Sequence, residues 1–338
     1  MTMMRRWEMT GLGRGALRLV RAPVPEPQPG HVLVKAAAAS LNYRDKLVIE
    51  HGMGLAPDFP FTPASDLAGT VAAIGDGVTR FRPGDRVITT FFPGWIDGRS
   101  AGSAKTPDAR TLGGSHPGVL AEYVSLPEDW FVSAPQSLDA AEASTLPCAG
   151  LTAWFALVER GHLRAGDSVL VQGTGGVALF GLQIAKAHGA ETFVTSGSED
   201  KRARAKSLGA DHAIDRDSWV ETVHRLTADR GVDHILELVG GAHLAKSLEA
   251  VAVDGRVSVI GVIEGYDLSA AAVNLLLKSA TVQGIFVGHR RALEDLVRAV
   301  DVLKLKPVID QRYALDDVPA ALDHLDRGPF GKIVVAFD

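Results

Sequence analysis

The spacing of hydrophobic residues changes along the chain. Over roughly the first 128 residues, short apolar or β-branched runs alternate with turn-forming residues such as Pro83-Gly84-Asp85. This pattern predicts a β-rich unit with strands at 17–20, 31–37, 69–74, 86–91 and 118–126. The segment 97–117 is polar and rich in Gly and Ser, so we expect a loop there.

A different pattern follows a helical stretch at 138–160 that Pro147 interrupts. Short apolar strands are predicted at 168–172, 191–195, 212–214, 232–238, 256–260 and 281–287. Helices are predicted at 177–188, 201–208, 219–228, 243–251 and 291–305, with a terminal strand at 333–337. This alternation predicts an α/β fold whose parallel sheet has helices on both faces, and six strands suit a doubly wound, Rossmann-like domain.

Length and composition narrow the class of protein. A chain of 338 residues predicts about two domains, and 46% hydrophobic with 22% charged residues is typical of a packed soluble protein. The net charge of −5 argues against a nucleic-acid groove, and no apolar run reaches the roughly 18 residues that span a membrane. Because the N-terminal segment lacks the apolar core of a signal peptide, we expect a cytoplasmic protein without membrane or nucleic-acid partners.

The chain contains a single cysteine, Cys148. It therefore has no internal disulfide framework and no zinc site built from four thiolates. We interpret Cys148 as a small buried residue rather than a reactive thiol. The eleven histidines form no HExxH motif and no close metal-binding pair.

A glycine-rich turn follows the predicted strand 168–172. Its residues are Gly173, Thr174, Gly175, Gly176, Val177 and Ala178, which match G-x-G-x-x-A. The first glycine of this pattern allows a tight turn, the second lets the backbone approach a pyrophosphate, and the third small residue lets the helix pack on the strand. Because the turn lies between a strand and a helix, it predicts dinucleotide binding at the helix N-terminus.

The end of the second strand bears on the choice of dinucleotide. An NAD site usually has an acidic residue there to bind the ribose 2′-hydroxyl. This chain has Ser196 and Ser198 instead, with Lys201 close behind, which suits a 2′-phosphate. We therefore expect NADP(H). Glu199 and Asp200 keep NAD(H) open as the alternative.

Six segments in the chain have the order and intervals of one known family. They are Ala39–Asp45, Gly69–Gly75, Pro83–Val87, Gly118–Tyr123, Leu146–Ala153 and Gly173–Val177. From end to end, the chain resembles the medium-chain dehydrogenase/reductase superfamily, and most closely its zinc-independent quinone oxidoreductase-like branch. The resemblance implies a GroES-like catalytic domain at 1–128, completed by 287–338, with a Rossmann-like NADP-binding domain at 129–286. It also implies an active site in the cleft between the domains and a homodimer.

Zinc-bearing relatives hold a catalytic metal through a Cys, a His next to a Glu, and a second Cys or an acid. The matching positions here are Asn42, Ser65 with Asp66, and Cys148. Only Cys148 among the directly matching positions is a good zinc ligand, and three protein ligands are normally required. The stretch 91–113, where relatives carry four structural cysteines, contains none. We therefore expect no zinc.

Without a Lewis acid, oxidation of simple alcohols is difficult, because nothing lowers the pKa of the alcohol. Hydride addition to a conjugated carbonyl is easier, since hydrogen-bond donors can stabilise the resulting enolate. We expect an NADPH-dependent reductase of a quinone or of the C=C bond of an enone. Leu47 stands where similar quinone oxidoreductases often have a tyrosine, which weakens the case for a quinone. A zinc-free alcohol dehydrogenase or carbonyl reductase, and a cofactor-binding protein with little turnover, are the alternatives.

The resemblance assigns roles to residues near the reacting groups. Asn42 and Tyr43 are the expected catalytic residues: Asn42 could bind the ribose or the substrate carbonyl, and Tyr43 could donate to an oxyanion. Asp45 is expected to be a structural carboxylate. Phe92 and Trp95 are candidates for the apolar wall of the substrate pocket, together with Tyr43 and Phe286, or for ordinary packing.

Further cofactor contacts are also implied by the resemblance. Thr152 would face the nicotinamide, and Lys332 would reach the pyrophosphate. Arg216 would supply a cation for the 2′-phosphate. The strand ends around the carboxamide group of the nicotinamide would contribute contacts from Ile260, Val262, Phe286, Val287 and Gly288.

Overall fold

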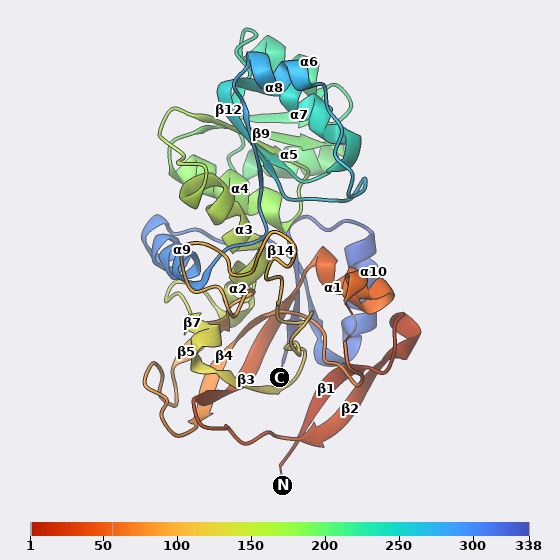
Figure 1. The fold of residues 1–338 in the computed structure, drawn as a ribbon, viewed down its shortest axis with the longest axis vertical. Helices are drawn as coiled ribbons and strands as arrows, with labels where there is room; N and C mark the ends of the chain where they lie inside the picture. The colour runs from red at the N-terminus through yellow and green to blue at the C-terminus, as the bar shows by residue number, and fades with distance from the viewer. Residues whose placement is uncertain (1, 56, 338) are drawn as a thin grey trace. The chain divides into compact units, whose positions relative to one another are not determined.

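The computed structural model describes residues 2–55 and 57–337 and forms two compact units. One unit comprises Met1–Leu151 and Gly288–Asp338, and the other comprises Thr152–Val287 (Figure 1). The first division falls at Leu151 rather than residue 128, because helix α2 (Ala140–Ala143) packs against strands of the first unit. Within the described residues, no helix is long and apolar enough to cross a membrane.

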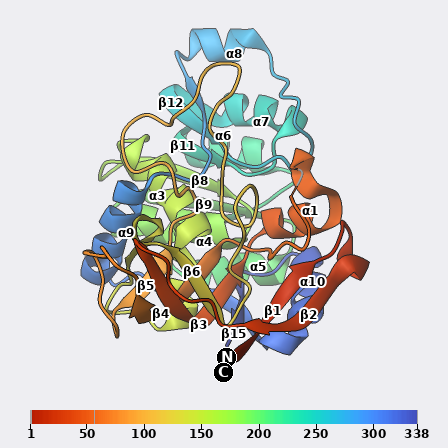
Figure 2. The ribbon, with the colours of Figure 1, turned by 60° about the horizontal axis from the view of Figure 1, so that its bottom comes forward.

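The first unit is built on a largely antiparallel sheet. Its strands follow the order β14 (Ile309–Ala314), β15 (Lys332–Ala336), β3 (His31–Leu41), β4 (Asp66–Ile74), β5 (Arg86–Thr89) and β7 (Phe131–Ser133), and β6 (Tyr123–Pro127) pairs with β3. Strands β1 (Met3–Met9) and β2 (Leu17–Pro23) form a separate antiparallel ribbon. The helices are α1 (Tyr43–His51), α2, α9 (Arg290–Leu303) and α10 (Val318–Asp326). The pairing of β15 with β3 brings the end of the chain beside residues 38–41 (Figure 2).

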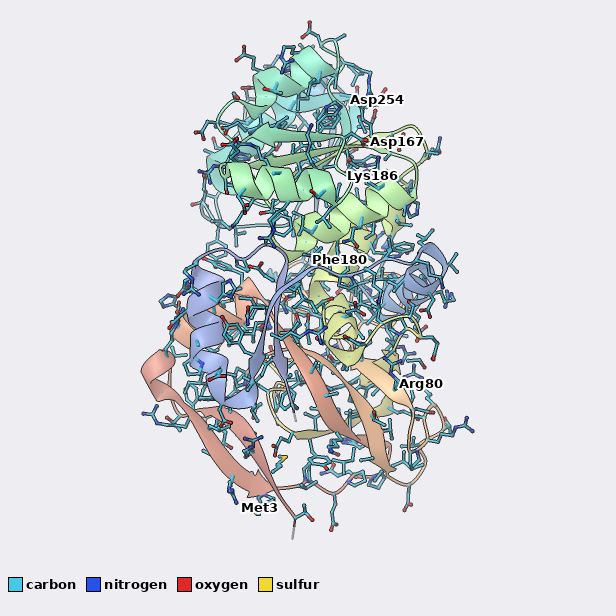
Figure 3. All side chains as sticks on the ribbon, turned by 180° about the vertical axis from the view of Figure 1, so that it is seen from behind. Met3, Arg80, Asp167, Phe180, Lys186 and Asp254 are labelled. Carbon is cyan, nitrogen blue, oxygen red and sulfur yellow. The ribbon has the colours of Figure 1, made fainter. Side chains whose placement is uncertain are left out.

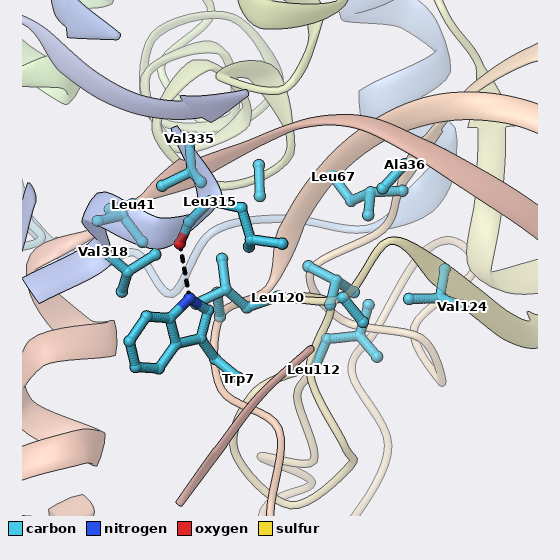
Figure 4. Close-up of a cluster of buried hydrophobic side chains, with 14 of the residues drawn as sticks. Trp7, Ala36, Leu41, Leu67, Leu112, Leu120, Val124, Leu315, Val318 and Val335 are labelled. Atoms are coloured by element: carbon cyan, nitrogen blue, oxygen red, sulfur yellow. Dashed lines mark hydrogen bonds between the residues drawn. The ribbon is translucent and has the colours of Figure 1, made fainter. Parts of the chain in front are cut away.

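The core of the first unit joins its N-terminal and C-terminal parts. Trp7 of β1 is buried, and its indole Nε1 donates to the carbonyl oxygen of Leu315 at 2.8 Å (Figure 4). Leu41, Leu120, Val318 and Val335 lie around this contact and come from four different segments. The first unit therefore depends on chain segments that lie about 300 residues apart.

The second unit is a six-stranded sheet in which every neighbouring pair is parallel. The order is β10 (His212–Asp215), β9 (Glu191–Ser196), β8 (Ser168–Gln172), β11 (Val232–Glu237), β12 (Val251–Val259) and β13 (Thr281–Gly284). The helices are α3 (Leu151–Trp154), α4 (Gly176–Ala187), α5 (Glu199–Ser207), α6 (Trp219–Leu226), α7 (Leu244–Ala250) and α8 (Ala272–Leu277). The α/β fold expected from the sequence is confirmed.

Helix α4 shows how the pattern of the sequence produces this layer. Phe180 is buried and Lys186 is exposed at the other end of the helix, where its ammonium binds Asp211 at 2.9 Å (Figure 3).

The order of the strands reverses at β8. The chain runs from β8 outward to β9 and β10, then returns to place β11 on the other side of β8. Ligands of such sheets bind at the carboxyl ends of the strands where the order reverses, which are here β8 and β11.

Candidate functional site

The turn after β8 has the geometry that a pyrophosphate requires. Gly173 has a φ of +80°, which favours glycine, and its N–H donates to the carbonyl oxygen of Thr195 at 3.0 Å. A Cβ added at Gly173 or Gly175 would meet no atom within 4 Å, so space is open above both residues. Gly175 caps α4 without a side-chain hydrogen bond, and Gly176 and Val177 begin the helix. The first N–H groups of α4 are therefore available to an anion.

Close packing of α4 on the sheet depends on two small residues. Ala178 is fully buried, as the fingerprint requires. Gly181 is one turn further on, and a Cβ there would lie 2.6 Å from a methyl group of Leu236 and 3.0 Å from one of Val171. Gly181 therefore lets the helix approach both β8 and β11, a role that the sequence analysis did not assign.

A buried carboxylate fixes the carboxyl ends of β8 and β11. Glu237 is 0% exposed, and its oxygens accept hydrogen bonds from the N–H groups of Val239 and Gly240 at 2.9 and 3.0 Å. Gln172, next to the glycine turn, donates from Nε2 to Glu237 at 2.9 Å and accepts from the N–H of Leu238. The side chains of His243 and Ser247 also hydrogen-bond the carboxylate.

The pKa of Glu237 reflects this arrangement. Burial alone would raise it, but the hydrogen bonds from His243, Ser247, Gln172 and Gly240 hold the pKa at about 2. The carboxylate is therefore charged at neutral pH. A glutamate inside the apolar run of residues 235–239 was the signal in the sequence that could have identified it.

Around the end of β9, the residues expected at the adenosine phosphate lie together. The Oγ of Ser196 accepts from the N–H of Ser198 at 3.2 Å, and Ser198 caps α5 by accepting from the N–H of Lys201. Arg216 lies over Gly197, where an added Cβ would be 3.2 Å from the guanidinium. Arg202 instead donates to the carbonyl oxygen of Ser196 and to Asp215, both at 2.7 Å. Arg216 is thus the more available of these two guanidinium groups.

The strand ends expected near the carboxamide form a tight crossing. The N–H groups of Ile260 and Gly261 both donate to the carbonyl oxygen of Glu237. A Cβ at Gly261 would lie 1.8 Å from the carbonyl oxygen of Leu238, so only glycine fits there. Val262 is more than one-third exposed.

Beyond β13, Phe286 is about half exposed, whereas Val287 is buried. Val287 has a φ of +58°, an uncommon conformation for a β-branched residue. Such conformations cluster at functional sites. Gly288 follows at the beginning of the next segment of the first unit.

In the first unit, Asn42 is held from both its backbone and its side chain. It caps α1, and its N–H donates to the Oδ2 of Asp45 at 2.7 Å. Asp45 is fully buried, and this burial raises the pKa of Asp45 to about 6. Asp45 is the third residue of α1, and its carboxylate accepts from the backbone of the capping residue Asn42, as in a capping box. This is the structural position that we expected for it.

Lys332 completes this polar cluster. Its side chain is 4% exposed, and its ammonium donates to the carbonyl oxygen of Leu41 at 2.7 Å and to the Oδ1 of Asn42. Nearby Asp66 accepts from the Oγ of Ser65 at 2.6 Å and from the N–H of Cys148 at 3.1 Å. Burial raises the pKa of Asp66, and the ammonium of Lys332 acts in the opposite direction. Contact of Lys332 with a pyrophosphate stays a prediction.

Tyr43 and Thr152 have contrasting environments. The side chain of Tyr43 is 46% exposed, and the ammonium of Lys46 lies 5.5 Å from the centre of its ring. Thr152 is buried in α3, at the beginning of the second unit. Tyr43 can therefore contact a ligand directly, whereas the role expected for Thr152 stays a prediction.

The aromatic cluster at the end of β5 packs within the first unit. Phe92 is buried, and the centre of its ring lies 5.8 Å from that of Trp95. The ring of Trp95 contacts that of His289 edge-on, with 5.3 Å between the ring centres. His289 caps α9 by accepting from the N–H of Ala292, and the carbonyl oxygen of Trp95 accepts from Arg290. These contacts hold the cluster together within the first unit, and both the packing role and the pocket-wall role of Phe92 and Trp95 stay predictions.

The residues at the zinc positions of relatives do not fit a zinc ion. Asn42 and Ser65 offer neutral oxygen atoms, and the ammonium of Lys332 directly contacts Asn42. Burial and the charge of Asp66 raise the pKa of the Cys148 thiol, which opposes the thiolate that a metal requires. Within residues 2–55 and 57–337, no group of three His, Cys, Asp or Glu side chains could hold a metal.

With this geometry in place, comparison with known proteins identifies the family. Residues 28–136 match the alcohol dehydrogenase GroES-like domain, and residues 176–302 match the zinc-binding dehydrogenase domain. The chain belongs to the medium-chain dehydrogenase/reductase superfamily. It is therefore an oxidoreductase of a superfamily that binds a nicotinamide cofactor.

Individual relatives match almost the whole chain. A zinc-type alcohol dehydrogenase-like protein of Schizosaccharomyces pombe is 37% identical, and the match covers 92% of each chain. Human quinone oxidoreductase is 27% identical over 92% of this chain and 91% of its own. A crystal structure from Sinorhizobium meliloti 1021, whose name groups it with the alcohol dehydrogenases, is 65% identical with a TM-score of 0.97. That match covers 100% of this chain and 99% of the other.

We predict that Glu237→Gln destabilises the protein at neutral pH. The folded pKa of about 2 lies below the ordinary 4.5, so the carboxylate contributes about 3 kcal/mol above pH 4.5. This contribution is lost as the pH falls from 4.5 toward 2. Urea denaturation of wild type and variant should therefore show a difference at pH 7 that shrinks below pH 4.5. Glu249→Gln, at an exposed position on α7, is the control, and equal stability of wild type and Glu237→Gln at pH 7 would contradict the prediction.

Proposed function

We propose that the protein is a zinc-independent, NADPH-dependent reductase of a quinone or of the C=C bond of an α,β-unsaturated carbonyl. The observation that carries this proposal is the composition of the buried cluster at Asn42. An amide, a hydroxyl next to a carboxyl group, and a thiol occupy the positions where zinc relatives have metal ligands, and the ammonium of Lys332 contacts the amide. This cluster offers hydrogen-bond donors but no set of ligands for the Lewis acid that alcohol oxidation uses.

The cofactor would supply a hydride from C4 of its nicotinamide ring. In the second unit, the open turn at Gly173 and Gly175 and the N-terminus of α4 would bind the pyrophosphate. The backbone at Ile260 and Val287 would orient the ring. The Glu237 network supports this role because it holds the ends of β8 and β11 in one arrangement.

Residues of the first unit would act on the acceptor. The phenol of Tyr43 is exposed and would donate a hydrogen bond to the carbonyl oxygen, where negative charge develops. The amide of Asn42, fixed through its Oδ1, would orient the acceptor or the ribose through its N–H groups.

The preference for NADPH rests on the end of β9. Ser196 stands where NAD sites usually have an acid, and the guanidinium of Arg216 is two-thirds exposed above Gly197. Arg202 is held by Asp215, so Arg216 is our candidate for the 2′-phosphate. Ser196 would add a hydroxyl donor.

We predict that the chelator-treated protein oxidises NADPH when a quinone or a simple enone is added. The reason is that hydride addition to a conjugated acceptor requires no metal-bound alkoxide. The absorbance of the reduced nicotinamide measures the reaction. Turnover of saturated aldehydes alone would favour the zinc-free alcohol dehydrogenase or carbonyl reductase. Tight NADPH binding without turnover would favour a binding protein, and binding of neither nucleotide would overturn the proposal.

A second prediction concerns the phosphate. Arg216→Ala should weaken NADPH binding roughly 10- to 100-fold, since a charge-assisted hydrogen bond contributes about 1.5–3 kcal/mol. The affinity for NADH should change less than about twofold, because NADH has no 2′-phosphate. Titration of nicotinamide fluorescence measures both affinities. Lys206→Ala, at an exposed position near the end of α5, provides the control. If NADPH and NADH both bind more weakly by the same factor, Arg216 does not bind the 2′-phosphate.

We also propose a homodimer formed through the second unit. Strand β13 ends the six-stranded sheet, and Leu276 and Leu277 of the adjacent α8 are 73% and 77% exposed. Apolar exposure of this kind beside an open strand edge is typical of an interface. The Leu276→Ser/Leu277→Ser variant should sediment as a monomer at concentrations where wild type is dimeric. Val302→Ser, at an equally exposed position on α9, should not change the oligomeric state. If the double variant is still a dimer, the interface does not involve Leu276 and Leu277.

A further inference from the structure

The ammonium of Lys332 is unusual because it is almost completely removed from water. Only 4% of the residue is exposed, and among the described residues its ammonium donates to the carbonyl oxygen of Leu41 and the amide oxygen of Asn42. Neither partner carries a charge. Burying an ammonium costs several kcal/mol unless opposite charges lie nearby.

The compensating charges come from two buried carboxyl groups. Asp66 and Asp45 are both 0% exposed, and the charge of Lys332 opposes the rise that burial causes in the pKa of each. In the sheet, Ile333 pairs with Leu41 and Asp66 pairs with Ser40, so Lys332 and Asp66 lie on either side of the end of β3. Arg44 is the other cation at Asp45, at 3.9 Å, but it is directed to Leu112 and Thr111 by its hydrogen bonds.

The contact with Lys332 also determines how the Asn42 amide is turned. Because the ammonium can only donate, it selects the amide oxygen, and Nδ2 is left with the two N–H donors. That Nδ2 is buried, and the hydrogen bond of the Asn42 side chain to Asp66 acts to lower the pKa of that carboxyl group. Asn42 is itself 8% exposed, and Asp45 holds its backbone. Lys332 thus fixes a side chain whose donors are directed at Asp66.

We infer that Lys332 supplies from the polypeptide the positive charge that a metal supplies at this place in zinc-bearing relatives, and that it is the positioning residue for Asn42. Its ammonium balances Asp66 and holds the Asn42 donors in one orientation. This role differs from a contact with the pyrophosphate of the cofactor. The kinetic part of the inference rests on the proposed function, whereas the charge balance does not.

The charge balance is tested by thermal unfolding of Lys332→Met, Asp66→Asn and the double variant. Removing the ammonium leaves Asp66 buried without its cation, so the melting temperature of Lys332→Met should fall by roughly 5–10 °C. The double variant should recover at least half of that loss. Additive losses in the double variant would overturn the pairing. Lys35→Met, at an exposed position of β3, is the matched control.

The positioning role is tested by separating cofactor binding from turnover. For Lys332→Met, the dissociation constant of NADPH should change less than about twofold while kcat falls about tenfold or more. Asn42→Ala should lower kcat similarly, and the double variant should be no slower than either single variant. Lys332→Arg, which keeps the charge, should recover part of kcat.

The opposite result is equally clear. If NADPH binding weakens more than tenfold while kcat at saturation is unchanged, Lys332 contacts the cofactor and the positioning role is wrong. Absence of turnover in the wild type would contradict the proposed function instead. In that case the unfolding cycle still decides whether Lys332 is the internal cation, because it requires no substrate.

Discussion

A buried ammonium must replace its lost hydration with hydrogen bonds to oxygen atoms of the protein. In the first unit, the hydrogen bonds of the Lys332 ammonium therefore determine how the neighbouring segments are arranged. Its partners lie at the end of β3, where Leu41 offers a carbonyl oxygen and Asn42 an amide oxygen. The same Asn42 begins α1 through its capping box with Asp45. One buried contact therefore joins β15 from the end of the chain, the end of β3 and the beginning of α1. The orientation of Asn42 follows from this constraint rather than from its own conformational preference.

The second unit solves the reverse problem, because it buries an anion. Glu237 compensates for its burial with two backbone N–H groups and three side chains, so its charge is retained. These donors come from β8, from the turn after β11 and from the beginning of α7. The turn that carries Gly173 is thus attached to the neighbouring strand by Gln172. A site for a long, flexible dinucleotide needs such rigidity, since every loop that is already ordered reduces the entropy lost on binding.

Local patterns in the sequence predicted the second unit well. Strand 168–172 matches β8 at both ends, because five buried residues lie between a turn and a glycine. The structure of the first unit was harder to predict from local patterns. Strand β1 carries Arg5 and Arg6 in a two-stranded ribbon, and α1 combines charged and apolar residues with little amphipathic pattern, so neither was predicted. The burial of Lys332 could not be predicted, because its partners lie 290 and 291 residues away. The Glu237 network had only one local signal, a glutamate inside the apolar run of residues 235–239.

The two buried charges also bear on the chemistry that we propose. An ammonium donates hydrogen bonds but has no vacant orbital, so it cannot bind an alkoxide as zinc does. It would lower the pKa of an alcohol only through its charge and its hydrogen bonds, which is a weaker effect than direct bonding to a metal ion. An acceptor that becomes an enolate has less need of a Lewis acid, because conjugation already spreads the charge and a phenol such as Tyr43 can stabilise the oxygen. The replacement of metal ligands by Asn42 and Ser65 and the buried position of Lys332 thus favour the same class of acceptor.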